Sequence, residues 1–537
     1  MTMAPRRRRV VRRSIALLEA LLPPLLLLLV LPTTAALGTG FDVREATIDS
    51  LHDALFGRAV TCREVVSAFL ARIEEYNPRI NAVVSLNPTA LADADRLDAR
   101  LAAGNATGPL FCVPVLLKDN FDAVGMPTTA GCRALAGNVP SEDAPTVRAL
   151  RDAGAVVLGK TNLHEMALEG LTVSSLGGQT VSPYDLTRTP GGSSGGSGAA
   201  VAASLAVLAT GTDTVNSLRS PASANALFSL RPTRGLVSRA GVVPVSYTQD
   251  AVGAVARSPR DLAVALTVMA AARRRDYAAA GLRPDRDGLA GLRLGVLHGF
   301  FNHTPSPETT PVNDVMARML SQLAAAGAEI VNITDRFPSV LSVAELDVQA
   351  FEFREALDSY LAAAAGLSRP ASFRELYSSS SSSSGGGGGG GGEFLVIPAQ
   401  HRFIRRAASS STADVAYLDA MHRIRNLTLE LGATFAAHRL DALVYPEQQN
   451  LVVKIGSPSQ RGRNGILAAL TGHPVVCVPA GLSPPWTTPP SACPELVPVR
   501  KMPPFANGTV EPRVYESVPS VAPNVAGIPD VYPLGVF

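Results

Sequence analysis

The stretch Pro190-Gly191-Gly192-Ser193-Ser194-Gly195-Gly196-Ser197-Gly198 leads directly into the small and apolar run Ala199–Leu208. A Gly/Ser loop that opens into a helix brings backbone N–H groups and a helix N-terminus to one point, where small side chains let a ligand approach closely. A second tract, Ser378–Gly392, contains only serine and glycine and has no such context. We therefore predict a ligand-binding loop at Ser193 and a flexible, low-complexity surface insertion over residues 378–392.

Two more segments can contribute polar groups to the same site. The loop Gly211–Pro221 follows the small, apolar run and contains Ser217. The segment Pro114–Asn120 places Lys118 at the end of an apolar strand, directly after three aliphatic residues. Burial disfavours the ammonium form and lowers a lysine pKa from about 10.4, so that the neutral amine can act as a base.

The rest of the chain alternates helical and strand-like patterns. Thr61–Tyr76 carries apolar residues at helical spacing with Thr61 as the N-cap, and Thr146–Ala153 is a second helical segment. The expected strands are residues 82–86, 113–117, 155–158, 293–297, 329–332, 442–445 and 475–478. This alternation is typical of an α/β domain with a buried sheet. A hydrophobic fraction of 46% and a charged fraction of 17% exclude a chain that is disordered throughout.

The motifs at these loops resemble the amidase signature family of serine hydrolases. The matching segments are Val113–Asn120, Gly125–Gly131, Gly159–Asn162, Pro190–Ser197 and the residues around Ser217. The resemblance runs from Val43 to Pro484 and implies a single large α/β domain, with a mixed β-sheet core covered by helices on both faces. On this basis we assign residues 37–493 to one amidase domain.

The resemblance also implies a catalytic set and a reaction. By position, the nucleophile is Ser217, the bridging serine in a cis peptide is Ser193, and the base is Lys118. A serine hydroxyl is too weakly acidic to attack an amide unaided, so Ser193 would relay its proton to the neutral lysine. The expected reaction is hydrolysis of a small-molecule amide at its C–N bond through an acyl-enzyme, with no cofactor and no metal.

Backbone N–H groups are expected to bind the oxyanion that forms when the carbonyl is attacked. By resemblance these donors belong to Thr214, Val215, Asn216 and Ser217. Asp213 and Arg219 would support this loop from behind, as a pair. Val215 and Asn216 stand where most family members have two glycines, so the loop must form without a positive φ at the β-branched Val215. With residues 218–225, this variant resembles a secreted, fungal-type branch of the family.

The C-terminal segment departs from the family pattern. Gly472–Gly481 fits the family's late strand, but the strand, helix and Gly-Arg-Pro turn that normally follow are absent. Residues 494–537 are Pro-rich and lack both the helical and the strand periodicity. We therefore expect an atypical tail with little regular structure.

Three other functions remain open. Gly192–Gly196 fits the pattern G-x-S-x-G with Ser194 as the nucleophile of an α/β-hydrolase-type esterase, although the preceding segment is a poor strand. A Ser-His-Asp triad also needs a histidine. His164 and His473 lie nearest to the motif loops along the sequence, and such histidines are more often structural. The altered loop and tail would also fit a catalytically impaired, amidase-fold secreted binding protein. One component of a tRNA amidotransferase shares the scaffold, but export would separate it from its partners.

The N-terminus predicts export. Six arginines and the apolar stretch Ser14–Leu31 precede small residues that end at Ala36, where we expect cleavage of a signal peptide formed by residues 1–36. An uncleaved membrane anchor is the alternative, which Pro23 and Pro24 disfavour. Without these arginines the net charge of +3 turns mildly acidic, which argues against nucleic-acid binding.

Two further features agree with a secretory route. The glycosylation pattern Asn-x-Ser/Thr occurs at Asn105, Asn302, Asn332, Asn426 and Asn507. The five cysteines show no metal-binding spacing and allow one or two disulfide bridges. We expect a secreted glycoprotein. If its N-terminal segment stays uncleaved, the protein would instead be anchored to a membrane of the secretory pathway. Whether it forms a homodimer is left open.

Overall fold

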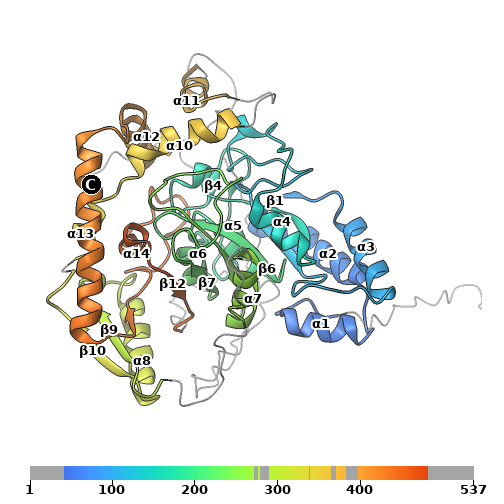
Figure 1. Cartoon of the computed structure of the whole chain (residues 1–537), viewed down its shortest axis with the longest axis horizontal. Coiled ribbons are helices and arrows are strands. Elements are labelled where there is room, and N and C mark those ends of the chain that lie inside the picture. The colour runs from blue at the N-terminus through green and yellow to red at the C-terminus, as the bar shows by residue number, and fades with distance from the viewer. Residues whose placement is uncertain are drawn as a thin grey trace, which may run out of the picture. The chain divides into compact units, whose positions relative to one another are not determined.

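The structure, a computed structural model (Figure 1), describes residues 41–270, 276–278, 289–337, 339–363, 370–382 and 397–481. From Asp42 on, the chain forms one compact unit. Several predicted features lie outside the described residues: the cleavage site at Ala36, the acceptor Asn507, Cys493, the tail 494–537 and residues 383–392 of the Ser/Gly insertion.

A mixed sheet of seven strands forms the core, in the order β1-β3-β2-β6-β8-β7-β12. Its strands are β1 (Val83–Leu86), β2 (Pro114–Lys118), β3 (Val156–Thr161), β6 (Leu208–Asp213), β7 (Phe228–Arg231), β8 (Ala251–Ala256) and β12 (Val475–Cys477). β2 runs parallel to both β3 and β6, whereas the other neighbours are antiparallel. Every residue of β2, β3, β6 and β8 is buried. Since alternate residues of a strand point to opposite faces, both faces of the sheet's centre are covered.

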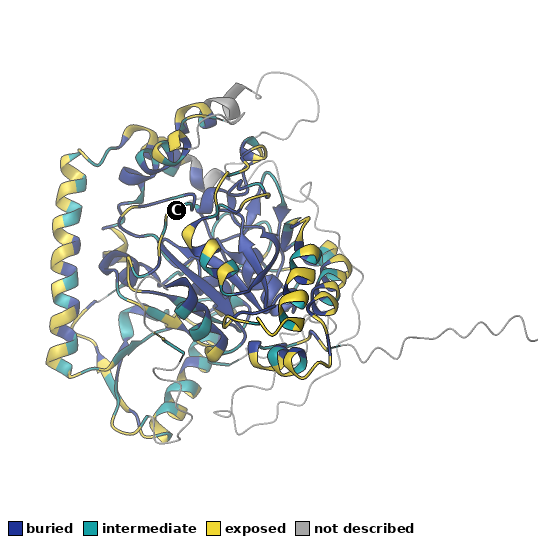
Figure 2. Ribbon diagram, turned by 45° about the vertical axis from the view of Figure 1, so that its right-hand side comes forward, coloured by how far each residue is buried: buried dark blue, intermediate teal, exposed yellow. Residues whose placement is uncertain are grey.

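Helices supply this cover. α5 (Gly195–Ala202) packs on β2, β3, β6 and β8, and α7 (Pro259–Met269) packs on β6, β7 and β8. α2 (Cys62–Ile80) and α3 (Ala90–Ala102) pack together and against β3, and α4 (Pro145–Asp152) packs against α7. Figure 2 shows a buried sheet surrounded by helices with exposed outer faces. The predicted fold class is confirmed.

A smaller parallel sheet has the order β10-β9-β11, with β9 (Arg293–Leu297), β10 (Glu329–Ile333) and β11 (Ala442–Val444). An apolar cluster that includes Leu297, Ile333, Leu427 and Leu470 joins it to α13 (Val415–His438) and α14 (Ile466–Thr471). Further elements are α1 (Ile48–Phe56), β4 (Val173–Ser174), β5 (Gly178–Gln179), α6 (Arg219–Ala224), α8 (Thr310–Ala325), α9 (Val340–Ala344), α10 (Gln349–Ala363), α11 (Phe373–Ser382) and α12 (Pro398–Ser409).

The predicted elements agree with the structure, but three strands of the central sheet, β6, β7 and β8, were not predicted. Each predicted strand overlaps an observed one, and α2 begins with a capping box between Thr61 and Glu64. However, α5 ends at Ala202, and Leu208–Asp213 is the central strand β6 rather than the end of a helix and the start of a loop. β6 forms because it pairs with β2 on one side and β8 on the other, which the local sequence does not reveal. Ser378–Ser382, predicted to be flexible, continue α11.

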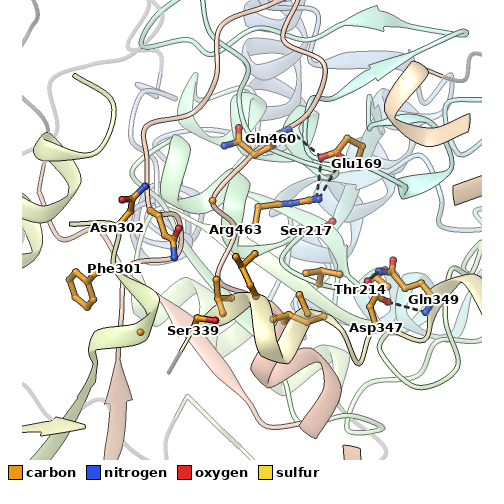
Figure 3. Close-up of a pocket in the computed structure, with 18 of the residues that line it drawn as sticks. Glu169, Thr214, Ser217, Phe301, Asn302, Ser339, Asp347, Gln349, Gln460 and Arg463 are labelled. Carbon is orange, nitrogen blue, oxygen red and sulfur yellow. Dashed lines mark hydrogen bonds and ion pairs between the residues drawn. The ribbon is translucent and has the colours of Figure 1, made fainter. Parts of the chain in front are cut away.

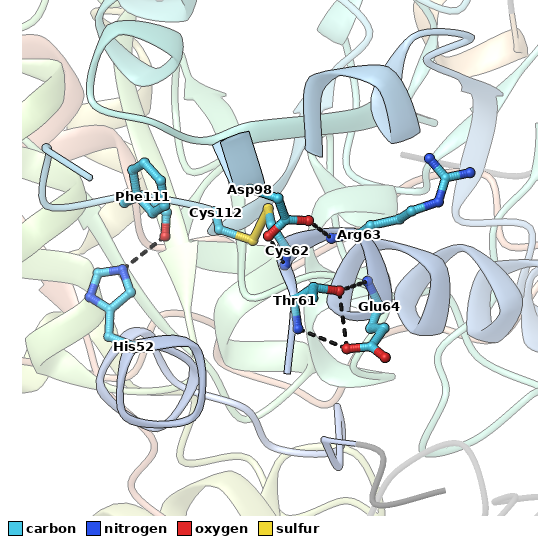
Figure 4. The surroundings of a disulfide bond; sticks show 8 residues. All are labelled: His52, Thr61, Cys62, Arg63, Glu64, Asp98, Phe111 and Cys112. Carbon is cyan, nitrogen blue, oxygen red and sulfur yellow. Dashed lines mark hydrogen bonds between the residues drawn. A yellow bond between two sulfur atoms is a disulfide. The ribbon is translucent and has the colours of Figure 1, made fainter. Parts of the chain in front are cut away.

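A disulfide joins Cys62 to Cys112 (Figure 4), with their Cα atoms 5.7 Å apart. The sequence alone left this pairing open. Cys62 is the first residue of α2 and its N–H donates to the Asp98 carboxylate at 2.7 Å, while Cys112 lies just before β2. The bridge therefore ties α2 to the strand that carries Lys118. Cys132 and Cys477 are buried free thiols.

Candidate active site

Lys118 is the last residue of β2, and its side chain is completely buried. Its Nζ lies 2.8 Å from Ser193 Oγ and 2.7 Å from Thr212 Oγ1, within hydrogen-bond distance of both hydroxyls. Burial lowers the pKa of Lys118 to about 7, against an opposing upward effect of Asp213 and Asp250. At neutral pH a large share of this amine is therefore uncharged and able to accept a proton.

The turn that carries Ser193 depends on closely packed glycines. The peptide bond Gly192–Ser193 is cis, where the resemblance places one. Thr172 Oγ1 donates to the carbonyl oxygen of Gly191 at 2.7 Å, and a Cβ at Gly195 would clash with the same hydroxyl. Gly191 also has a φ of +73°, a conformation that glycine adopts without strain. The glycines thus allow the turn to bring Ser193 against Lys118.

Ser217 lies in the loop between β6 and α6. The Ser194 N–H donates to the Ser217 carbonyl at 3.3 Å, which connects this loop to the Ser193 turn. The Ser217 side chain is mostly buried but borders a cavity. The hydrogen bonds of the described residues include none between the Ser217 hydroxyl and Ser193. The structure therefore contains the Lys118–Ser193 half of the expected relay.

The backbone around Ser217 has unused donors. Among the described residues, the N–H groups of residues 214–217 have no hydrogen-bond acceptor. Neither Val215 nor Asn216 has a positive φ, so the loop forms without glycine at these positions. The carbonyl of Asn216 accepts from the Ser220 N–H at 2.8 Å, which fixes the orientation of the peptide plane that ends in the Ser217 N–H.

Asp213 ends β6 and anchors this loop. Its completely buried carboxylate accepts from Arg219 Nε at 3.0 Å and from Arg231 Nη1 at 2.7 Å. Burial would raise the pKa of Asp213, but the two guanidinium groups outweigh burial and hold the pKa well below its usual range. Arg219 also donates to the carbonyls of Val215 and Gly465. The Asp213–Arg219 pair therefore holds the Ser217 loop against the residue that precedes α14.

The cavity beside Ser217 has a volume of about 640 Å³ (Figure 3). Thr214 and Val215 line it from the Ser217 loop. Its other walls come from distant parts of the chain, among them Glu169, Asp347 and Arg463. The volume is within the range of ligand pockets, about 300–1,000 Å³.

A family model described as Amidase matches residues 64–488. The chain belongs to the amidase family. Enzymes of this family act on amide C–N bonds, and the prediction of an amidase-signature enzyme is confirmed. The match covers the strand of Lys118, the turn of Ser193 and the loop of Ser217.

Solved structures similar to this amidase include several enzymes. The native peptide amidase from Stenotrophomonas maltophilia has a TM-score of 0.69 and 34% identity, covering 81% of this chain and 90% of that one. An amidase family protein from Bacillus anthracis has a TM-score of 0.68 and 26% identity, covering 82% and 85%.

The curated relatives are matched over a shorter range. A glutamyl-tRNA(Gln) amidotransferase subunit from Azoarcus sp. is 43% identical over 302 residues, which are 54% of this chain and 61% of that protein. The chain thus matches about three fifths of that relative's length. These bacterial relatives do not support the fungal-type branch, which stays a prediction.

Ser194 and the two histidines do not form an alternative triad at the amidase cavity. Ser194 is completely buried, and its Oγ donates to the Thr212 carbonyl at 3.2 Å. The residues directly before this turn form no strand, although a nucleophile elbow requires one. His164 is buried, which lowers its pKa to about 4. His473 does not line the cavity. The structure therefore does not favour the α/β-hydrolase alternative.

Several residues of this site were not predicted from the sequence, namely Glu169, Thr212, Arg231, Asp347, Arg463 and Gly465. Only Thr212 had a usable signal, because it directly precedes Asp213 in a motif segment that we interpreted as a loop. Among the described residues, no group of three or more His, Cys, Asp or Glu side chains could hold a metal ion.

Proposed function

We propose that this amidase hydrolyses a carboxylic amide through an acyl-enzyme at Ser217, with Ser193 and Lys118 transferring the proton. The observation that carries the proposal is the 2.8 Å contact between Lys118 Nζ and Ser193 Oγ. Burial lowers the pKa of this lysine to about 7. A buried amine with hydroxyl partners and a pKa near neutrality suits a general base for a serine nucleophile.

The proton moves in two directions during acylation. As Ser217 Oγ bonds to the amide carbonyl carbon, its proton passes through Ser193 to the neutral Lys118. The same route returns the proton to the leaving nitrogen as the C–N bond breaks, because an amine anion is a poor leaving group. Water then attacks the acyl-enzyme, and its proton restores the Ser217 hydroxyl as the acid departs.

Backbone N–H groups of residues 214–217 would bind the oxyanion. Arg219 binds the Val215 carbonyl, and in a trans peptide this fixes the Asn216 N–H in the opposite direction. A well-placed donor of this kind contributes roughly 3 to 4 kcal/mol to transition-state stabilisation. Asp213 and Arg219 act here as positioning residues, because they hold the loop and do not line the cavity.

The proposed substrate is an amide with an extended acyl part. A cavity of about 640 Å³ is larger than a simple aliphatic amide requires. A similar solved enzyme is a peptide amidase, with 34% identity over most of both chains. A peptide amide is therefore the first substrate class to test.

We also propose that the enzyme is secreted. The Cys62–Cys112 disulfide supports this route, because disulfides persist in oxidising compartments. Asn105, Asn332 and Asn426 are exposed and accessible to glycosylation, while Asn302 is half-buried at the cavity. Within the described ranges, no helix is long and apolar enough to cross a bilayer.

Expression of the full chain in a eukaryotic secretory host tests this route. We expect the mature protein in the medium, beginning after Ala36 and reduced in mass by a glycosidase. Retention in membranes with residues 1–36 still attached would support the anchored alternative. Unglycosylated protein that remains in the cytosol would contradict both.

Labelling of the folded chain with a fluorophosphonate tests the nucleophile. We expect one adduct at Ser217 by peptide mass spectrometry, and no adduct and no amide hydrolysis in Ser217→Ala. An adduct at Ser194 would support the esterase alternative. Folded protein that neither reacts at Ser217 nor hydrolyses amides would overturn the proposal and favour the binding-protein alternative.

A further inference from the structure

The cavity beside Ser217 combines an apolar lining with two charged groups. Val340, Ile466 and the strongly exposed Leu341 form part of the apolar lining. Arg463 and Asp347 line the same cavity. In a cavity that binds only alkyl or aryl amides, a charged side chain would lose its hydration when the substrate covers it and would gain no partner in return. These two groups therefore point to polar groups on the substrate.

Glu169 holds Arg463 in place (Figure 3). Arg463 Nη1 lies 3.1 Å from Glu169 Oε1, and Nη2 lies 3.5 Å from Oε2. The carboxylate also accepts from the Gly170 N–H at 2.7 Å and from Ser459 Oγ at 3.3 Å. The Arg463 side chain is 29% exposed and that of Glu169 is 8% exposed. The cavity is therefore faced mainly by the guanidinium, a rigid hydrogen-bond donor.

Asp347 provides an acceptor in the same cavity. Its carboxylate accepts from the Gln349 N–H at 3.0 Å and from Gln349 Nε2 at 2.6 Å (Figure 3). A carboxylate offers about four lone-pair sites, so acceptor capacity remains for a ligand. Gln349 keeps the carboxylate oriented.

We propose that Arg463 and Asp347 select substrates that carry a peptide unit next to the scissile amide. Arg463 donates to the carbonyl oxygen of that unit, and Asp347 accepts from its N–H. This inference rests on the proposed amidase function and names the residues that recognise the acyl part. One donor and one acceptor match the two polar groups of a peptide unit, whereas a plain acyl chain leaves both charged groups unpaired.

Two substrates isolate the contribution of this unit. N-acetyl-L-leucinamide and 4-methylpentanamide share the same carbon skeleton and scissile amide, and only the first carries an acetamido group. Ammonia release gives kcat/KM for each. We expect the wild-type chain to prefer N-acetyl-L-leucinamide by about 100-fold or more, because a site built for hydrogen bonds rejects an analogue that lacks them.

Variants at the two charged residues then test the assignment. Arg463→Gln and Asp347→Asn should each lower the ratio of the two kcat/KM values by about tenfold or more, mainly through KM for N-acetyl-L-leucinamide. Arg461→Gln and Glu345→Gln are matched controls, since both residues are exposed and outside the cavity lining. Both controls should keep the wild-type ratio.

A double variant distinguishes loss of substrate selection from loss of folding. Arg463→Gln leaves the buried Glu169 carboxylate without its countercharge, so the double variant Glu169→Gln/Arg463→Gln removes both charges. The double variant should show the same reduced ratio.

The outcomes separate this inference from the proposed function. Equal losses for both substrates, or an unchanged ratio in all variants, would show that the two residues are structural and would overturn the inference alone. Wild-type hydrolysis of both amides at the same rate would do so as well. If the wild-type chain hydrolyses neither amide and Ser217 is not labelled, the proposed function fails and the inference fails with it.

Discussion

Two buried lysines on neighbouring strands of this enzyme have similar local sequences and different surroundings. β2 reads Pro-Val-Leu-Leu-Lys and ends at Lys118, and β3 contains Val-Val-Leu-Gly-Lys up to Lys160. Both side chains are completely buried. In the parallel pairing Lys118 is opposite Thr161 and Leu117 is opposite Lys160, so the two lysines point to opposite faces of the sheet.

Their partners distinguish them. Lys118 Nζ forms hydrogen bonds with the hydroxyls of Ser193 and Thr212. Lys160 Nζ donates to the carbonyls of Phe121 and Pro127 at 2.8 Å each, and it lies 3.6 Å from the Asp119 carboxylate. Burial lowers the pKa of both lysines, but Asp119 opposes the shift at Lys160 at close range. This difference in partners predicts a structural role for Lys160 and a proton-exchanging role for Lys118.

The largest expected effect comes from removing the proposed base. Lys118→Ala should lower kcat/KM by about 10³-fold or more, because Ser217 then lacks a proton acceptor. The unfolding free energy of this variant has to be measured as well, because removal of the completely buried side chain leaves a cavity and two hydroxyls without their lysine partner. Steady-state kinetics and urea denaturation measure both quantities. A variant with near-normal rates would contradict the relay.

Lys160→Ala should show the opposite pattern. It leaves the buried Asp119 carboxylate uncompensated, and breaking such a pair costs about 3–5 kcal/mol of unfolding free energy. Protein that remains folded at low temperature should keep its active-site chemistry. Urea denaturation and fluorophosphonate labelling of Ser217 on the same sample check this. A fully stable but inactive variant would show that Lys160 also acts in catalysis.

The pH dependence should report Lys118. Because burial lowers its pKa to about 7 and the base must be neutral, kcat/KM should fall by about tenfold per pH unit below 7. Between about pH 7 and pH 10.4 the lysine is protonated in the unfolded chain and neutral in the folded chain. The contribution of Lys118 to the unfolding free energy therefore rises with pH over this range. Both trends should be absent in Lys118→Ala. An acidic limb centred near pH 4 would point to a carboxylate instead.

Thr212→Val should have the smallest effect. It removes the hydroxyl 2.7 Å from Lys118 Nζ while keeping the size of the side chain. We expect kcat/KM to fall by about tenfold, because the amine loses one of its two orienting partners. Thr161→Val, on the strand opposite Lys118, is the matched control and should keep the rate within about threefold. Equal losses in both variants would indicate a general packing effect.

The motifs named candidate residues for the site, because each motif is a continuous segment with its own chemistry. Lys118, Ser193 and Ser217 lie in such segments, and the structure brings the first two into contact. The residues that complete the site are not encoded locally. Arg231 reaches Asp213 because β7 pairs with β8, and β8 pairs with β6. The strand character of Leu208–Asp213 was missed for the same reason.

The sequence by itself predicted β1, β2, β3 and β9 to β12, the polar residues that follow the β2 strand, and the glycines that permit the Ser193 turn. The base was assigned to Lys118 from the resemblance to the amidase family, because the similar apolar runs before Lys118 and Lys160 do not by themselves distinguish the two lysines. Only the tertiary structure shows which groups surround each amine, and the pKa of a buried amine depends on groups that other segments bring to it. For Lys118 those groups are hydroxyls from the Ser193 turn and β6, and for Lys160 they include a carboxylate.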